Sequence, residues 1–258
     1  MVYPPVRVRH KLKKLPHKLE KLVDGQSLAS ARRHTLRLLW PNRFRLETRR
    51  VTDTIDRAGF EQIRQRYAVE DPGEDWPKYL DLEHWIDINI RRIREIELDV
   101  ARPKRVLDLG CGAGYFLHIA QLLGHTGLGL DVDYLPMFGE ITRLLGVRRV
   151  ISRIEPFTPL PHLGGKFDLI TAFMICFNNH KQANLWGVPE WKFFLDDLSK
   201  YLTPRGRVWL ELNREYDGTF YTLELKEFFQ KRGAKIDEHK IIFNSGLRAL
   251  ASTLPVVR

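Results

Sequence analysis

The chain has 258 residues, 43% of them hydrophobic, and a formal net charge of +10. A chain of this length can bury a full core, as one domain or as one domain with an extension. No apolar run approaches the ~20 residues of a membrane-spanning helix, and the first residues lack the apolar core of a signal peptide. The two cysteines, Cys111 and Cys176, and the nine histidines form no C-x-x-C pair or ligand-like cluster. We therefore expect a cytoplasmic protein without disulfides or a bound metal.

The basic charge is concentrated at the N-terminus. Residues 1–50 hold 14 Lys and Arg against three acids, a net charge of +11, and the remainder is close to neutral. Because like charges repel and three prolines interrupt the segment, residues 1–26 should form an extended or partly disordered arm. Three interpretations stay open: a solvated tail, an arm that binds RNA, and an arm that binds an anionic membrane surface. A mitochondrial presequence is disfavoured because the segment is rich in Lys and interrupted by Pro.

Three helices are predicted before the first strand. The first spans Ser27 to Leu39, the second runs from a cap at Thr52 or Asp53 to Tyr67, and the third covers about Leu80 to Leu98. On the third helix, Asp87 and Arg91 can pair at i,i+4. The break at Asp71-Pro72-Gly73 predicts a boundary between a basic N-terminal extension, residues 1–72, and a main domain, residues 73–258.

Strands and helices alternate from residue 105 onward, which predicts a doubly wound α/β fold with a mostly parallel, seven-stranded sheet. The expected strands are residues 105–109, 127–132, 149–154, 167–173, 207–212, 235–243 and 247–254. The expected helices are residues 115–123, 135–145, 190–202 and 223–231. Asn244-Ser245-Gly246 is a hairpin signal, so the last strand should be antiparallel.

A glycine turn follows the first strand in the sequence VLDLGCGAG, residues 106–114. Its glycines, Gly110, Gly112 and Gly114, follow a G-x-G-x-G pattern; a dinucleotide fingerprint would need a glycine where Tyr115 stands. The next strand ends in Asp131, 21 residues after Gly110. A carboxylate at about this distance can accept hydrogen bonds from ribose hydroxyls, and the alternative is a cap of the following helix.

These residues closely resemble the first motif of the class I S-adenosylmethionine-dependent methyltransferases, a resemblance that extends from about residue 80 to the C-terminus. It implies their Rossmann-like fold, their activity and S-adenosyl-L-methionine as the cofactor. It also implies that Asp108 organises the cofactor's amino group, that Asp131 holds the ribose and that Val132 flanks the adenine. The other positions assigned to the cofactor site are Gly110, Cys111, Gly112, Gly114, Phe173 and, with the strand register left open, Glu155.

The loop after the fourth strand, Ala172 to His180, carries no motif specific to DNA methyltransferases. It lacks an Asn/Asp-Pro-Pro-Tyr/Phe sequence and a Pro-Cys pair, and is more similar to the loop of small-molecule and lipid-type methyltransferases. His180 is the candidate general base, although it could equally be an ordinary loop residue. The loop of residues 213–221 and the segment 186–189 should face the acceptor, and relatives often close a lid at the positions of Tyr79 and Trp85.

The expected function is therefore transfer of a methyl group to an O or N atom of a small-molecule, lipid-linked or glycan acceptor. Two alternatives remain. The chain could be an RNA methyltransferase that uses its basic arm as a phosphate clamp, or a scaffold that binds the cofactor without catalysis, since no residue of the sequence is an unambiguous catalyst.

Overall fold

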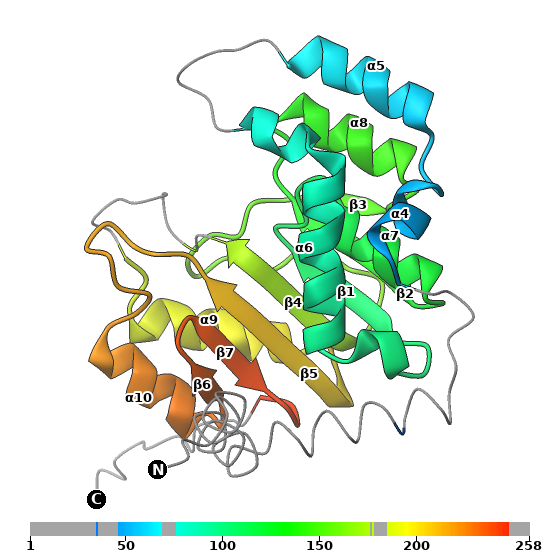
Figure 1. The fold of residues 1–258 in the computed structure, drawn as a ribbon. Coiled ribbons are helices and arrows are strands. Elements are labelled where there is room, and N and C mark those ends of the chain that lie inside the picture. Colours follow the sequence, from blue (N-terminus) through cyan, green and yellow to red (C-terminus); the bar gives the residue numbers. More distant parts are fainter. Residues whose placement is uncertain (1–34, 36–45, 69–75, 176, 178–184, 248–258) are drawn as a thin grey trace, which may run out of the picture.

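The computed structural model describes residues 35, 46–68, 76–175, 177 and 185–247 of the chain. Seven strands form one sheet in the order β3-β2-β1-β4-β5-β7-β6, with helices on both faces (Figure 1). The strands are β1 (Arg105–Leu109), β2 (Thr126–Asp131), β3 (Arg149–Ile151), β4 (Phe167–Ile175), β5 (Leu202–Leu212), β6 (Lys235–Asp237) and β7 (Lys240–Phe243). This confirms the predicted doubly wound α/β fold.

Strands β1 to β5 pair in parallel, and β7 is antiparallel to both of its neighbours. The antiparallel strand was expected at residues 247–254, whereas among the described residues β7 is the strand that runs antiparallel to its neighbours. The segment expected as one strand, residues 235–243, is instead the hairpin of β6 and β7. Glu238 adopts a left-handed φ of 49°, which lets the chain reverse between Asp237 and Lys240. Residues 248–254 lie outside the described part.

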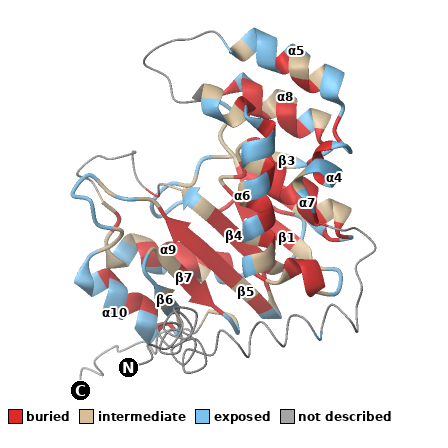
Figure 2. Cartoon of the chain, viewed as in Figure 1, coloured by how far each residue is buried: buried red, intermediate tan, exposed pale blue. Residues whose placement is uncertain are grey.

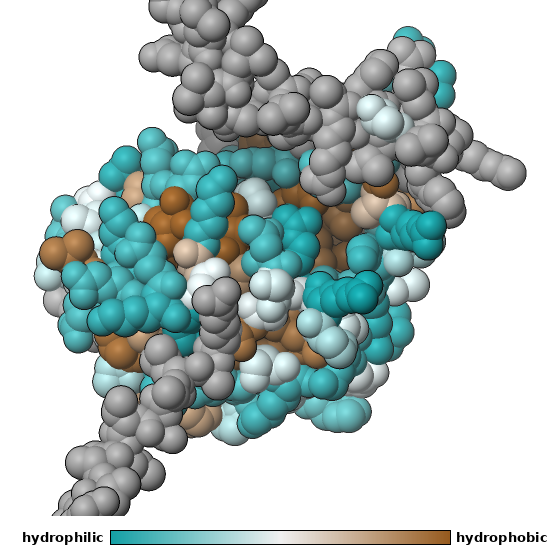
Figure 3. All heavy atoms as spheres, turned by 90° about the horizontal axis from the view of Figure 1, so that it is seen from below, coloured by the Kyte–Doolittle hydropathy of each residue, from teal (hydrophilic) through white to brown (hydrophobic). Residues whose placement is uncertain are grey.

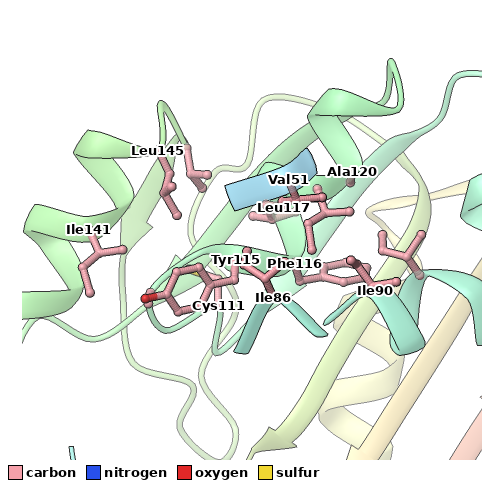
Figure 4. Packing of buried hydrophobic residues seen from close by; sticks show 14 of the residues in the cluster. Val51, Ile86, Ile90, Cys111, Tyr115, Phe116, Leu117, Ala120, Ile141 and Leu145 are labelled. Atoms are coloured by element: carbon pink, nitrogen blue, oxygen red, sulfur yellow. The ribbon is translucent and has the colours of Figure 1, made fainter. Parts of the chain in front are cut away.

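Two apolar layers enclose the sheet, and its strands are largely buried while the outer faces of the helices are exposed (Figure 2). On one face lie α6 (Leu82–Glu95), α7 (Tyr115–Leu122) and α8 (Pro136–Leu144). On the other lie α9 (Val188–Ser199) and α10 (Leu223–Lys231). Figure 4 shows how α7 fills the first layer: its Tyr115, Phe116 and Leu117 are surrounded by side chains of α4, α6 and α8.

The N-terminal helices α4 (Thr48–Thr52) and α5 (Arg57–Tyr67) belong to this first layer. The cap of α5 is Asp56, whose carboxylate accepts from the backbone N–H of Ala58 and Gly59, and not Thr52 or Asp53 as expected. Helix α5 lies against α8, where the Tyr67 hydroxyl donates to Glu140 at 2.8 Å. The boundary near residue 72 stays a prediction, but apolar residues on both sides of it share one core.

Helix α6 begins after Asp81, whose carboxylate accepts from the N–H of His84 at 3.1 Å. The predicted Asp87–Arg91 pair is confirmed at 3.1 Å on its exposed side. The helix ends at Glu95, and Leu98 lies in the following short helix η2 (Leu98–Val100). A second 3₁₀ helix, η1 (Trp76–Leu80), precedes α6 and brings aromatic side chains to the same end of the sheet.

The connection from β3 to β4, residues 152–166, contains no helix. Its prolines, Pro156, Pro159 and Pro161, disfavour helix formation, and Leu160 and Leu163 pack into the second layer instead. Among the described residues, no helix is long and apolar enough to cross a membrane. Seen from below, the coloured surface is mostly hydrophilic, with hydrophobic side chains between the hydrophilic ones (Figure 3).

Candidate functional site

A cavity of about 140 Å³ lies at the carboxyl ends of β1 and β4, beneath α6. Ligands of doubly wound sheets bind at this edge. The cavity is lined by Tyr79, Trp85, Asn89, Arg92, Asp108, Gly110, Cys111, Gly112, Ala113, Tyr115, Phe116, Phe138, Phe173 and Met174. Its wall therefore combines the glycine loop with aromatic rings and two side chains of opposite charge.

The glycine loop adopts a backbone conformation that side chains rarely permit. Gly110, Gly112 and Gly114 have φ values of 70°, 52° and 79°. A Cβ at Gly112 would meet nothing nearer than the Phe138 ring at 3.9 Å, so this glycine faces open space. At Gly114 a Cβ would contact Thr142 and Val147, so this glycine permits close packing at the start of α7 and does not line the cavity.

Asp131 is held at the end of β2 by the glycine loop. Its Oδ2 accepts from the Gly112 N–H at 2.5 Å and its Oδ1 from its neighbour's N–H, that of Val132, at 2.7 Å. Burial raises the pKa of this carboxyl, while these two hydrogen bonds and the positive charge of Arg149 oppose the shift. Arg149 itself is ion-paired with Asp133, which fixes the loop after β2. Each carboxylate oxygen keeps a further lone pair for a ligand hydroxyl.

Asp108 lies at the floor of the cavity and is fully buried. Burial raises its pKa to about 7. The Thr171 hydroxyl, which donates to its Oδ1 at 2.7 Å, and the Arg92 guanidinium oppose the rise, and the charges of Asp131 and Glu211 add to it. A carboxyl in this state gains from any cation that enters the cavity.

Arg92 projects from α6 into the same cavity. Its side chain is only 16% exposed, with Nε 3.7 Å from Glu211 Oε2 and Nη1 donating to Asn89 Oδ1 at 3.2 Å. The guanidinium lies 4.4 Å from the centroid of the Phe173 ring. Phe173 and Glu211 are register partners on β4 and β5, so the sheet sets the position of this cation.

An aromatic wall closes the side of the cavity toward η1 and α6. The ring of Tyr79 stacks on Trp85 at 4.6 Å and meets Phe138 edge-on at 5.1 Å. The Tyr115 hydroxyl donates to the Tyr79 carbonyl at 2.8 Å and ties this wall to α7. Burial raises the pKa of the Cys111 thiol well above its usual value, so this thiol stays neutral and is no nucleophile.

The structure brings most of the expected cofactor residues together. Asp108, Gly110, Cys111, Gly112 and Phe173 line the cavity, as do Tyr79 and Trp85. Asp131 and Val132 do not line it, but the Asp131 carboxylate accepts from the N–H of Gly112 in the lining loop and from the N–H of Val132. Glu155 is exposed on the β3–β4 connection and is not among the residues that line the cavity. His180 lies outside the described residues.

Asn89, Arg92 and Phe138 line the cavity but were not expected from the sequence. A signal for Asn89 was present, because it is a polar residue on the buried side of α6, between Ile86 and Ile93. No comparable signal marks Arg92, since its role depends on the cavity beneath the helix. Among the described residues, no group of three or more His, Cys, Asp or Glu side chains could hold a metal ion.

A smaller pocket of about 20 Å³, room for one water molecule, adjoins the carboxyl ends of β4 and β5. It is lined by Ile175, Phe177, Leu185, Trp186, Trp191, Leu212, Glu215, Phe220, Tyr221, Thr222 and Leu225. The two segments expected to face the acceptor, 186–189 and 213–221, both contribute to it. A Cβ on Gly110, which lines the cavity, would lie 3.0 Å from the side chain of Ile175, which lines the small pocket, so the two spaces are close together.

No protein-family profile and no curated protein sequence matches this chain. An amino pentose methyltransferase from Micromonospora echinaspora, solved with S-adenosylmethionine bound, is 20% identical with a TM-score of 0.44; the match covers 64% of this chain and 92% of that one. A methyltransferase from Streptomyces caelestis is 22% identical with a TM-score of 0.35; the match covers 45% of this chain and 47% of that one. A ribosomal protein methylase from Lactobacillus delbrueckii is 21% identical with a TM-score of 0.35; the match covers 63% of this chain and 74% of that one.

These likenesses are distant, and the chain spans about half the length of the Streptomyces caelestis enzyme. Five parallel strands, the antiparallel β7 between β5 and β6, and the glycine loop after β1 are all present. Together they form a doubly wound sheet of Rossmann-like topology, the fold that the resemblance to the class I S-adenosylmethionine-dependent methyltransferases implied.

Proposed function

We propose that this chain is an S-adenosylmethionine-dependent methyltransferase that acts on an O or N atom of a small-molecule, lipid-linked or glycan acceptor. The observation that carries this proposal is the pair of opposite charges in the cavity, Asp108 and Arg92, beside a glycine loop that holds Asp131. A ligand with a zwitterionic amino-acid end and a ribose would satisfy all three side chains.

The residues fit that cofactor group by group. Asp108 would receive the ammonium of the methionine end, and Arg92 its carboxylate, because charge-assisted hydrogen bonds are the stronger class. Asp131 keeps free lone pairs for the ribose hydroxyls, beside Val132. When bound, the cofactor supplies an electrophilic methyl group on sulfur.

The chain's own contribution to the reaction would be orientation and exclusion of water. The aromatic wall of Tyr79, Trp85 and Phe138 shields the cavity, and positioning alone supplies a large part of the rate of a displacement. Asp108 is an unsuitable base for the acceptor because it would face the ammonium. His180 remains the proposed general base, needed only if the acceptor must lose a proton.

Two variants and two ligands test this assignment. Arg92→Met should weaken binding of S-adenosylmethionine by about ten- to a hundredfold, since a hydrogen bond to a charged group contributes about 1.5–3 kcal/mol. It should leave 5′-methylthioadenosine, which lacks the amino-acid end, unaffected. Asp131→Ala should weaken both ligands, because both contain the ribose. Calorimetry measures all four affinities, with Asp87→Ala on the exposed side of α6 as a control.

Unchanged affinity of the nucleoside for Asp131→Ala would remove Asp131 from the site. Equal losses of both ligands in Arg92→Met would indicate general damage to the cavity. Activity needs a separate measurement: transfer of labelled methyl groups to extracts containing small molecules, lipids or RNA. Cofactor binding without any transfer would support the non-catalytic scaffold instead.

A further inference from the structure

The exposed apolar side chains of the described residues are concentrated at one end of the molecule. Six large hydrophobic side chains are more than 40% exposed: Tyr134, Ile151, Phe157, Met174, Tyr216 and Leu223. Scattered exposed apolar residues are ordinary on a protein surface, so their distribution matters more than their number. Here the distribution is one-sided.

Each of these residues belongs to a segment at or beyond the carboxyl end of a parallel strand. Ile151 ends β3 and Met174 lies one residue before the end of β4. Tyr134 follows β2 by three residues, and Phe157 lies in the connection that leaves β3. Tyr216 and Leu223 lie in the connection after β5 and at the first residue of α10.

The parallel strands β2, β3, β1, β4 and β5 end at a common edge of the sheet, and the cavity lies at the same edge, so the segments that follow these strands start beside it. Met174 is one of the six exposed residues, at 43% exposure, and it also lines the cavity. It holds a left-handed φ of 55°, a strained conformation for a side chain of this size. We call these six residues the apolar rim.

We propose that the apolar rim docks this end of the molecule on a lipid bilayer that contains anionic lipids. Two independent features favour this partner. The rim offers side chains that can enter the boundary between headgroups and acyl chains, and residues 1–50 carry a net charge of +11. Stable membrane attachment generally requires two such signals together, one apolar and one polybasic.

The composition of the rim favours lipid over RNA. Tyr134, Phe157 and Tyr216 could stack on bases, but Ile151, Met174 and Leu223 offer RNA neither a ring nor a charge. All six side chains can enter the boundary between the headgroups and the acyl chains of a bilayer. Docking in this orientation would turn the cavity toward the membrane surface. The proposal concerns where the cavity faces and does not depend on methyl transfer.

The test uses the full chain and sedimentation with vesicles of phosphatidylcholine alone or mixed with phosphatidylglycerol. We expect binding to the mixed vesicles that weakens as salt rises, without disappearing, because screening affects the arm and not the rim. The variant Tyr216→Ser/Leu223→Ser should lower the partition coefficient about tenfold or more at high salt. Gln230→Ser, an exposed neutral change at the other end of α10, is the matched control.

Binding of S-adenosylmethionine, measured in the same samples, checks that the variants are folded, since neither Tyr216 nor Leu223 lines the cavity. The proposal is overturned if the intact chain binds neither vesicle. It is also overturned if the double variant matches the unmodified chain at every salt concentration, which would leave the arm alone as the contact. A stronger loss of binding to RNA than to vesicles in the double variant would assign the rim to RNA.

Discussion

At the scale of single residues, the protonation of Asp108 makes the charge of the cavity depend on pH. Its pKa of about 7 means that the carboxyl is partly protonated near neutrality in the ligand-free protein. The cofactor's ammonium would favour the ionised form, so binding below pH 7 must release a proton.

We therefore expect the affinity for S-adenosylmethionine to fall by up to about tenfold for each pH unit below 7 and to level off above it. Calorimetry in two buffers of different ionisation enthalpy at pH 6 would detect the released proton directly. Asp108→Asn should bind weakly at every pH and show no such slope. A slope that survives in this variant would assign the proton to another group.

The same raised pKa affects folding stability in the opposite direction: stability falls as the pH rises, whereas the affinity for the cofactor rises. The carboxyl keeps its proton more tightly in the folded chain than in the unfolded chain, where its pKa is near 3.8. Its favourable contribution is complete below pH 3.8 and is lost as the pH rises through 7. As the pH rises from 5 to 8, the free energy of unfolding of Asp108→Asn should therefore increase relative to that of the unmodified chain, by on the order of 1–3 kcal/mol.

Urea unfolding of the ligand-free proteins at both pH values measures this difference. The comparison between pH values matters more than either value alone, because the amide changes the local hydrogen bonds at both. If the difference between the two proteins is the same at pH 5 and pH 8, Asp108 does not titrate in this range.

At the scale of elements, α6 supports both the core and the cavity. It buries Ile86, Ile90 and Ile93 toward α7 and presents Asn89 and Arg92 to the cavity. Removal of its cap, Asp81→Ala, should cost about 0.5–2 kcal/mol of unfolding free energy. It should also weaken cofactor binding, because the first turn of α6 carries Trp85, a residue of the aromatic wall.

Asp56→Ala is the control for this prediction. It removes the cap of α5 and should cost a similar amount of stability, again about 0.5–2 kcal/mol. Since α5 contributes no residue to the cavity, cofactor binding should be unchanged. Denaturant unfolding and calorimetry on both variants separate the two effects. Equal losses of binding would mean that α6 has no special role at the site.

The sequence allowed the parallel strands and the motif residues to be predicted because both depend on local patterns. Apolar runs marked β1, β2 and β4, and the glycine spacing located Asp108, Gly110 and Gly112. The split of residues 235–243 into β6 and β7 depends on Glu238 adopting a left-handed conformation, for which its residue type gives no signal. Arg92 was missed because α6 and the glycine loop meet only in the folded chain.

At the scale of the whole molecule, the N-terminal helices and the main domain share a core. Val51, Ile55, Phe60 and Ile63 are buried in the same layer as α6, α7 and α8. Removal of residues 1–75 should therefore cost several kcal/mol, since each buried side chain of this kind contributes about 1.5–3 kcal/mol. This differs from the expectation of an independent domain that begins near residue 73.

Removal of residues 1–45 is the matched deletion, because it keeps α4 and α5 and removes most of the basic charge. It should retain the stability and cofactor affinity of the full chain. Thermal unfolding and calorimetry compare the two deletions. A stable protein that begins at residue 76 would support the predicted boundary near residue 72 and show that the domain does not need α4 and α5.

In the part of the chain that the structure describes, the two outermost strands of the sheet, β3 and β6, are each three residues long. A strand at the edge of a sheet exposes unpaired N–H and C=O groups, which another chain can use for pairing. With so few residues at either edge, the sheet offers little template for addition of a strand from a second molecule. Any association between copies of this chain should therefore use helical or loop surfaces, and the sheet should end where one molecule ends.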